Sequence, residues 1–235
     1  GISYTMKKTE TIFNYHEETK HHQHRYARSL GYMDWANQPN PFRLFEDASR
    51  ITLPLSSSDS VEEAKTLFSK KSVSGSLSLG SLAYFLELSM GLSAWKGAGA
   101  DKWALRMNPS SGNLHPTEAY VILPSLGGYP AGIYHYSPYL HALELLMPFS
   151  DEDGAKFDVK EGFAVILTTI VWREAWKYGE RCFRYCNHDV GHALGSMVSS
   201  ANLEGWGVTQ MNIEDSFLEK ILGFDMLSFV ENEEE

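Results

Sequence analysis

The hydrophobic positions of the chain follow two periods, one typical of helices and one typical of strands. Within residues 77–95, apolar side chains recur at the i, i+3, i+4 spacing of a helix that is buried on one side. Residues 172–185 lead into a second, longer helical pattern, with these residues along one face: Phe183, Cys186, Val190, Leu194, Met197 and Ala201. We therefore predict two helices that pack against the core.

Strand-like segments lie between and around these helical patterns. Residues 51–55 form a short extended segment, and residues 162–171 form the continuous apolar, β-branched run expected of an interior strand. Residues 131–136 and 141–146 are joined by a Ser-Pro turn, which predicts a hairpin. Together these elements predict an α+β fold, with a small mixed or antiparallel sheet flanked by long helices.

The first 55 residues differ from the rest, because they are polar and aromatic and carry four clustered histidines: His16, His21, His22 and His24. Lys20, Arg25 and Arg28 lie among these histidines and would repel a cation, which favours a solvated helix face over a metal site. We predict a leading arm over residues 1–55 and one lobe over residues 56–235.

Composition excludes several classes of function. The chain has 235 residues, 43% of them hydrophobic, which is enough for a full core. Its net charge of -10 argues against nucleic acid as a partner, because phosphate binding needs a basic surface. No apolar run approaches the roughly 20 residues that span a bilayer, and the first residues lack the apolar core of a secretory signal. We therefore expect no membrane association. Two cysteines cannot form a disulfide framework, which agrees with a reducing compartment, so we expect a cytoplasmic location.

The two cysteines raise a zinc alternative. Cys182 and Cys186 share one face of the predicted helix, whereas His188 and His192 lie roughly 120° around it at about 100° per residue. One straight helix cannot present all four side chains to a single ion. We therefore predict no metal site.

The central run of residues 106–120 is a loop that feeds a strand. Pro109 and Pro116 each fix a φ angle, and Gly112 permits a backbone conformation that other residues resist. Ser110, Ser111 and Asn113 offer donors and acceptors on this stiffened loop, which suits binding of a planar heterocycle. The same residue types also form ordinary surface loops, so composition leaves both interpretations open.

Two motifs resemble those of a known family. The pattern Pro109-Ser110-Ser111-x-Asn113-x-x-Pro116 resembles the flavin-contacting loop of the nitroreductase-like FMN flavoproteins. With Arg106 ahead and Glu-Ala-Tyr-Val behind, it is similar to the SagB-type dehydrogenase branch, whose best-known members oxidise azolines to azoles in peptides. The run Lys-Tyr-Gly-Glu-Arg at 177–181 resembles the Lys-Tyr-Gly-x-Arg motif of that branch.

The resemblance implies FMN as the cofactor and a hydride-transferring oxidoreductase as the activity. The isoalloxazine and ribityl chain would be held by Arg106, Pro109, Ser110, Ser111 and Asn113. Lys177 and Tyr178 would serve proton transfer, although such a pair at a strand-to-helix corner is also typical of an ordinary surface. The family further implies a small-molecule or peptide substrate, an NAD(P)H donor, and a homodimer or a pairing with a second related lobe.

The phosphate-binding motif departs from the family pattern. Where an Arg-Arg-Ser-x-Arg run is usual, this chain has Lys70, Lys71 and Ser72, followed by Ser74. Lysine lacks the planar fork that grips phosphate oxygens in pairs, and the chain ends in an acidic run at 231–235. An alternative hypothesis is therefore a flavin-poor structural or partner-binding lobe of a tandem or dimeric protein.

Overall fold

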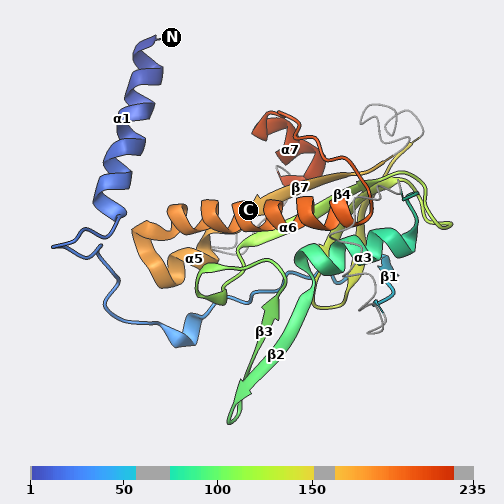
Figure 1. Ribbon diagram of the computed structural model, residues 1–235, viewed down its shortest axis with the longest axis horizontal. Helices are drawn as coiled ribbons and strands as arrows, with labels where there is room; N and C mark the ends of the chain where they lie inside the picture. The colour runs from blue at the N-terminus through green and yellow to red at the C-terminus, as the bar shows by residue number, and fades with distance from the viewer. Residues whose placement is uncertain (1, 57–74, 151–161, 225–235) are drawn as a thin grey trace.

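A computed structural model describes residues 2–56, 75–150 and 162–224 (Figure 1). Five of its strands form one antiparallel sheet, and their order across the sheet is β1 (Arg50–Thr52), β6 (Ala142–Pro148), β5 (Gly132–Ser137), β4 (Thr117–Leu123) and β7 (Ala164–Thr169). The hairpin predicted from the Ser-Pro turn is confirmed as β5 and β6.

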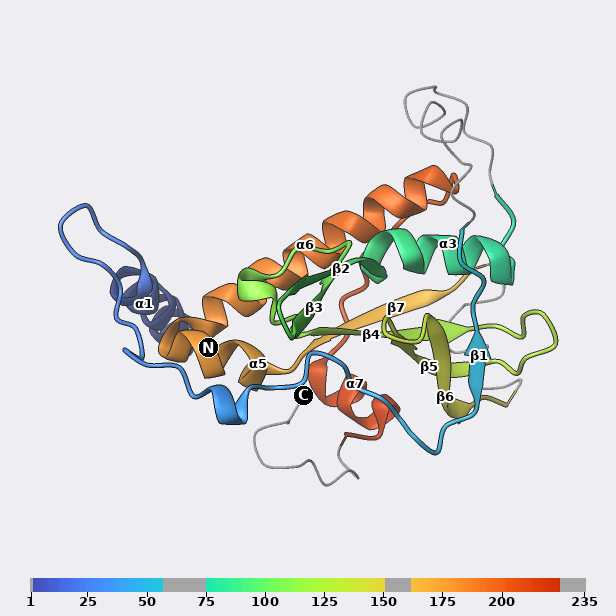
Figure 2. The ribbon, with the colours of Figure 1, turned by 90° about the horizontal axis from the view of Figure 1, so that it is seen from below.

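Helices cover both faces of this sheet. Figure 2 shows α3 (Leu79–Met90) and α6 (Cys182–Leu203) on one face and α7 (Asp215–Leu222) on the other. Side chains of β4 point alternately to the two faces, so Val121 joins the core under α3 and α6 while Tyr120 joins the core on the α7 side. Strand β4 lies between β5 and β7 and is buried along its whole length, so it is an interior strand of the sheet.

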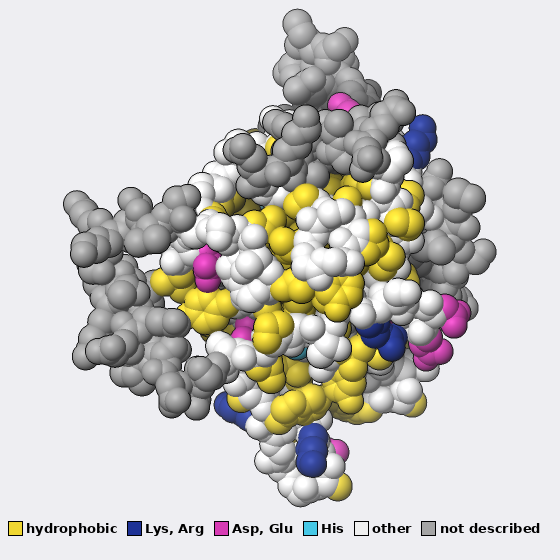
Figure 3. Space-filling model, turned by 90° about the vertical axis from the view of Figure 1, so that its right-hand side faces the viewer, with side chains coloured by type: hydrophobic (Ala, Val, Ile, Leu, Met, Phe, Trp, Pro, Cys, Tyr) yellow, Lys and Arg dark blue, Asp and Glu magenta, His cyan; other side chains and the backbone are white. Residues whose placement is uncertain are grey.

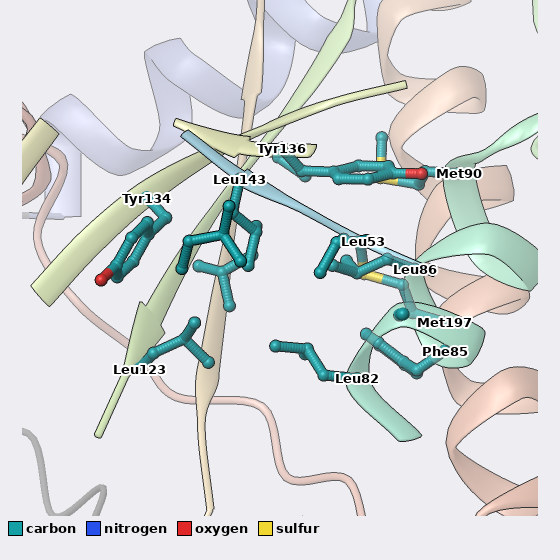
Figure 4. Close-up of a cluster of buried hydrophobic side chains, with 14 of the residues drawn as sticks. Leu53, Leu82, Phe85, Leu86, Met90, Leu123, Tyr134, Tyr136, Leu143 and Met197 are labelled. Carbon is teal, nitrogen blue, oxygen red and sulfur yellow. The ribbon is translucent and has the colours of Figure 1, made fainter. Parts of the chain in front are cut away.

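The larger core lies between the sheet and the α3–α6 layer. Figure 4 shows side chains from strands and helices converging there, and its labelled members are Leu53, Leu82, Phe85, Leu86, Met90, Leu123, Tyr134, Tyr136, Leu143 and Met197. Ten fully or nearly fully buried apolar side chains of this size supply the main driving force for folding, at roughly 1.5–3 kcal/mol each.

The helix predicted over residues 77–95 ends earlier than expected. Ser78 begins α3 with a capping box, in which its side chain and that of Ser81 each accept a backbone N–H bond from the other residue. Gly91 ends the helix by donating its N–H to the carbonyls of Leu86 and Glu87. The prediction was wrong beyond Met90, because the chain turns there into strand β2 (Leu92–Ala98), which pairs with β3 (Asp101–Arg106). These two strands form a ribbon that projects from the body (Figure 1).

The second helical pattern is confirmed, but it comprises two helices and a different buried face. The short helix α5 (Val171–Tyr178) ends at Gly179, whose φ of +53° redirects the chain through η3 (Gly179–Arg181) into α6. Phe183 and Leu194 were placed on the apolar face, yet they are 59% and 42% exposed. The buried face carries Asp189 instead, which is 1% exposed.

The leading arm packs against the corner between α5 and α6. Helix α1 (Ile2–Thr19) contacts it through Tyr15, whose hydroxyl donates to the Glu180 carbonyl oxygen at 2.9 Å. Arg28 forms two hydrogen bonds with the Glu180 carboxylate, each 2.8 Å long. Trp35 contacts the Trp176 ring edge to face, at 5.5 Å between ring centres. The arm therefore supports the helix corner that carries Lys177 and Tyr178.

Within the described ranges, every helix is too short or too polar to cross a bilayer.

Candidate functional site

The proline-braced loop connects β3 to the interior strand β4. It contains the 3-10 turn η2 (Ser111–Asn113), and three of its residues have positive φ angles: Gly112 at +67°, Asn113 at +58° and His115 at +50°. Positive φ is uncommon for residues other than glycine, so the surrounding contacts must hold the loop in this conformation.

Asp189 of α6 holds one side of the loop. Its carboxylate accepts a hydrogen bond from the Ser110 hydroxyl at 2.7 Å, from the Ser111 backbone N–H at 3.1 Å and from the Ser111 hydroxyl at 3.2 Å. Pro109 is held on the same helix, because its carbonyl oxygen lies 3.3 Å from His192 Nδ1. The two serines singled out from the sequence are thus anchored by a carboxylate that the sequence did not single out.

Asn113 holds the other side of the loop. Its Nδ2 donates to the Ala104 carbonyl oxygen of β3 at 2.8 Å, and its Oδ1 lies 2.6 Å from His115 Nε2. Burial lowers the pKa of His115 to about 3, helped by Arg106 and Arg173, so the imidazole is neutral and Nε2–H donates to Asn113. Both ends of the Asn113 carboxamide therefore have partners within the protein.

The structure brings Lys177 and Tyr178 against this loop. A Cβ atom added to Gly112 would lie 2.8 Å from the Tyr178 hydroxyl oxygen and 3.1 Å from Lys177 Nζ. The Tyr178 ring packs against the Tyr185 ring at a tilt of 40°, with 4.2 Å between ring centres, and burial raises the pKa of Tyr178. The pair stands at the end of α5, so the expected strand-to-helix corner is instead a helix-to-helix corner.

Arg106 lies beneath the loop and is almost completely buried. Its Nη2 donates to the Pro41 carbonyl oxygen, and its guanidinium lies over the Phe42 ring at 5.3 Å. Burial lowers the pKa of Arg106 to about 10, against the opposing effect of Glu118, so it remains charged at neutral pH. Its Nε and Nη1 have no hydrogen-bond partner in the described part of the chain, which leaves two donors for an added acceptor.

A row of buried charges runs beside Arg106 on the α7 side of the sheet. His135 of β5 lies between two carboxylates, with Nε2 2.8 Å from Glu118 and Nδ1 2.9 Å from Glu144. Arg173 donates to Glu118 at 2.7 Å, and Arg50 donates to Glu144 at 2.9 Å. Arg173 also donates to the His115 carbonyl oxygen at 2.7 Å, which joins the charge row to the loop.

The protonation states in this row follow from its geometry. Burial alone would lower the pKa of His135, but the hydrogen bonds to Glu118 and Glu144 outweigh it and raise the pKa. Burial alone would raise the pKa of Glu118, but Arg173 and His135 lower it to about 2. His135 is therefore an imidazolium that donates from both ring nitrogens.

The remaining predicted cofactor residues, Lys70, Lys71 and Ser72, lie outside the described residues. Sequence reasoning missed Asp189, Glu174 and Arg173, which are all buried around the loop. The signal that could have found Asp189 is its spacing, three residues after Cys186 and four before Ala193, because both of those residues are buried in α6.

Replacing Gly112 by alanine tests how tightly the loop fits against Tyr178. Gly99 at the tip of the β2–β3 ribbon has a φ of +66°, and an added Cβ there would meet nothing within 4 Å. Gly99→Ala is therefore the matched control, with only the backbone cost of about 1–2 kcal/mol. We expect Gly112→Ala to lose a further 1–3 kcal/mol or so, because the methyl group collides with Tyr178. Urea denaturation measures both, and equal losses would contradict the tight fit.

Comparison with known proteins gave matches to individual relatives, whereas no family model matches the chain. The chain is 29% identical over 130 residues to the trifolitoxin-processing protein TfxB of Rhizobium leguminosarum bv. trifolii, a match that covers 50% of this chain and 35% of that protein. It is 27% identical over 181 residues to a protein of Methanocaldococcus jannaschii named as a nitroreductase, covering 70% of this chain and 84% of the relative.

Solved structures give similar results. A protein of Anabaena variabilis described as a nitroreductase matches with a TM-score of 0.62 and 27% identity, over 80% of this chain and 38% of that one. The E. coli microcin synthetase McbBCD complex with truncated pro-MccB17 bound matches with a TM-score of 0.52 and 18% identity, over 91% and 86% of the two chains. The chain spans little more than a third of the trifolitoxin-processing protein and of the Anabaena variabilis structure.

Proposed function

Because the chain is a nitroreductase-like protein of the SagB-type branch, we propose that it is an FMN-dependent oxidoreductase. It would move hydride between a donor and a small-molecule or peptide substrate. The observation that carries this proposal is the convergence of two sequence motifs, since Gly112 of the loop lies against Lys177 and Tyr178 of the helix corner. The two motifs are more than 60 residues apart in the chain, and the fold makes them one site.

The donors of this site suit a heterocycle that carries hydrogen-bond acceptors. Arg106 keeps two buried donors without a partner among the described residues, and Lys177 forms no ion pair with any of them. The two Arg106 donors can be directed at a flavin carbonyl or ring nitrogen, where negative charge develops on reduction. When bound, FMN would supply the chemistry of accepting and returning a hydride.

The polar residues of the loop have a different proposed role from that of Arg106. Ser110, Ser111 and Asn113 already have protein partners, so their main contribution would be to fix the backbone that faces the flavin. Lys177 and Tyr178 would move the proton that accompanies hydride transfer, since both of their polar atoms lie at the loop surface. Lys70, Lys71 and Ser72 would hold the phosphate, with NAD(P)H as an electron donor.

The relatives guide the proposal on substrate and assembly. The trifolitoxin-processing protein is named for the processing of another product, which supports the peptide substrate that the resemblance implies. A homodimer, or a pairing with a second related lobe, would complete the site as it does in the family. A cytoplasmic location is consistent with two free cysteines.

FMN and riboflavin together test both the cofactor and its phosphate site. We expect FMN to shift its visible absorbance on binding and to raise stability by about 2.7 kcal/mol at a hundredfold excess over Kd. Riboflavin lacks the phosphate and should bind more weakly. In Lys70→Ala/Lys71→Ala this preference for FMN should disappear, while riboflavin binding stays unchanged. No absorbance shift with either flavin at tens of micromolar would refute the proposed cofactor.

A second candidate function is a partner-binding lobe that binds flavin weakly or not at all. Figure 3 shows hydrophobic side chains over much of the described surface on the side of α3 and β1, with few charged groups among them. Leu55, just after β1, is 70% exposed. Such surfaces mark contacts with other proteins. A dimer by sedimentation without flavin binding, and turnover unaffected by Asn113→Asp, would favour this function.

A further inference from the structure

The carboxyl group of Glu174 is buried beside the candidate site, but the proposed chemistry does not use it. Glu174 belongs to α5, one turn before Lys177, and its side chain is fully buried. Neither carboxyl oxygen accepts a hydrogen bond from a donor in the described part of the chain. A buried carboxylate without a donor or a cation is costly, so its state needs an explanation.

The serine donors beside Glu174 bind its neighbour Asp189. The Glu174 carboxyl lies beside Asp189 and Ser110. Asp189, however, receives the Ser110 hydroxyl, the Ser111 hydroxyl and the Ser111 backbone N–H. The nearest basic group to Asp189, His192 Nδ1, is 4.0 Å away on a half-exposed side chain. Two ionised carboxylates side by side in a buried site would repel each other, which favours a proton on one of them.

We propose that Glu174 is a positioning residue: it remains a neutral carboxylic acid, donates its proton to Asp189, and thereby fixes the Ser110–Asn113 loop against Lys177 and Tyr178. Asp189 then accepts four hydrogen bonds and keeps the negative charge, because three of its donors come from the loop. Glu174 supplies the fourth, so the loop, α5 and α6 meet at one shared proton. The effect on the loop is independent of flavin binding, whereas any effect on turnover rests on the proposed function.

The groups that face Glu174 agree with this state. Burial and then Asp189 together raise the pKa of Glu174 to about 9, against smaller opposing effects of Lys177 and Ser110. The thiols of Cys182 and Cys186 and the hydroxyl of Tyr178 also face Glu174, and each has a raised pKa. All three are therefore neutral near pH 7, and the smaller opposing effect on the pKa of Glu174 comes from Lys177 and Ser110.

The sign of the pH dependence follows from the raised pKa. In an opened loop, Glu174 ionises near its ordinary value of 4.5, whereas in the closed loop it keeps its proton to about 9. The closed loop is therefore most favoured below pH 4.5, and the advantage is lost as pH rises towards 9. Glu174→Gln keeps a donor to Asp189 and cannot ionise, so it lacks this dependence.

Two measurements on the whole chain test the proposal. Infrared spectra at pH 7 should show a carboxylic-acid carbonyl band in the wild type that is absent from Glu174→Gln. The hydrogen-exchange protection of the Ser111 amide should match between the two proteins near pH 5. As pH rises above 5, Ser111 protection in the wild type should fall relative to Glu174→Gln by up to tenfold per pH unit. The fall should level off above about pH 9.

Two further variants separate positioning from simple packing. Glu174→Met fills the space but donates no hydrogen bond, so we expect Ser111 protection at pH 5 to fall at least tenfold, with Glu174→Gln unaffected. Gly99→Ala, on the distant ribbon, should leave Ser111 protection unchanged. A wild type without the acid band at pH 7, or equal pH dependence in wild type and Glu174→Gln, would overturn the proposal even if Glu174→Met fails to fold. These readouts need no flavin, so they are separate from the test of the cofactor.

Discussion

Replacing Glu118 by alanine is expected to lower the free energy of unfolding by about 3–5 kcal/mol at pH 5.5. The Glu118 carboxylate is 1% exposed and lies between Arg173, at 2.7 Å, and His135, at 2.8 Å. Its removal leaves a buried guanidinium and a buried imidazolium without the anion between them. Arg106, which Glu118 also stabilises electrostatically, adds a third cation to the same region.

An exposed ion pair on the same chain provides the control. Arg28 donates two hydrogen bonds of 2.8 Å to Glu180, so its geometry is at least as good as that of the Glu118 pairs. Its side chain is 73% exposed, however, and Arg28→Ala should cost only about 0–1 kcal/mol. Urea denaturation of both variants measures the difference, and similar losses would show that burial does not determine the strength of the charge row.

The loss of unfolding free energy in Glu118→Ala should depend on pH and be largest within a limited pH range. The lowered pKa of Glu118 stabilises the fold above its ordinary value of 4.5, and this contribution is lost as pH falls to about 2. The raised pKa of His135 acts in the opposite direction, since its contribution is complete below 6.5 and is lost as pH rises through the folded-state pKa. The difference between wild type and Glu118→Ala should therefore be largest between about pH 4.5 and 6.5.

The sequence was sufficient for the class of fold, and it supplied the two motifs of the candidate site. Alternating and helical periods predicted a small mixed or antiparallel sheet, the β5–β6 hairpin and long flanking helices, because local hydrophobic patterns reflect which face is buried. The loop motif and the Lys177–Tyr178 motif each came from the sequence alone. Their contact did not, since it depends on the turn that Gly179 makes between α5 and α6.

The sequence was insufficient where polar groups are buried. Helix α6 was assigned an apolar face through Phe183 and Leu194, yet the buried face carries Asp189, whose partners are two serines nearly 80 residues away. Glu118, His135 and Glu144 similarly lie on three adjacent strands, and only sheet register brings them together. Hydrophobic periodicity assigns polar residues to the exposed face. It therefore misses buried polar residues whose hydrogen-bond partners are brought close only by the tertiary structure.

Lys177→Ala is expected to slow oxidation of an azoline-containing peptide by about 10²–10⁴-fold without weakening FMN binding. Dehydrogenation of an azoline releases a hydride and also a proton, and the proton needs a base. Lys177 Nζ is directed to the Gly112 turn and has no ion-pair partner among the described residues, so the proposed function assigns that role to it. Single-turnover reduction of bound FMN, followed by its visible absorbance without oxygen, measures the rate.

NADPH provides the decisive comparison for Lys177, because it donates a hydride to flavin and leaves no proton to remove. Reduction of bound FMN by NADPH should therefore change by no more than a few-fold in Lys177→Ala, while the peptide reaction is lost. Lys220 lies on α7, across the sheet, so Lys220→Ala should not change the rate of FMN reduction by either the peptide or NADPH. Equal loss with both donors would mean that Lys177 holds the flavin instead of moving a proton. Unchanged rates with both would exclude Lys177 from the chemistry, and Tyr178 at the same turn would then be the remaining candidate for the base.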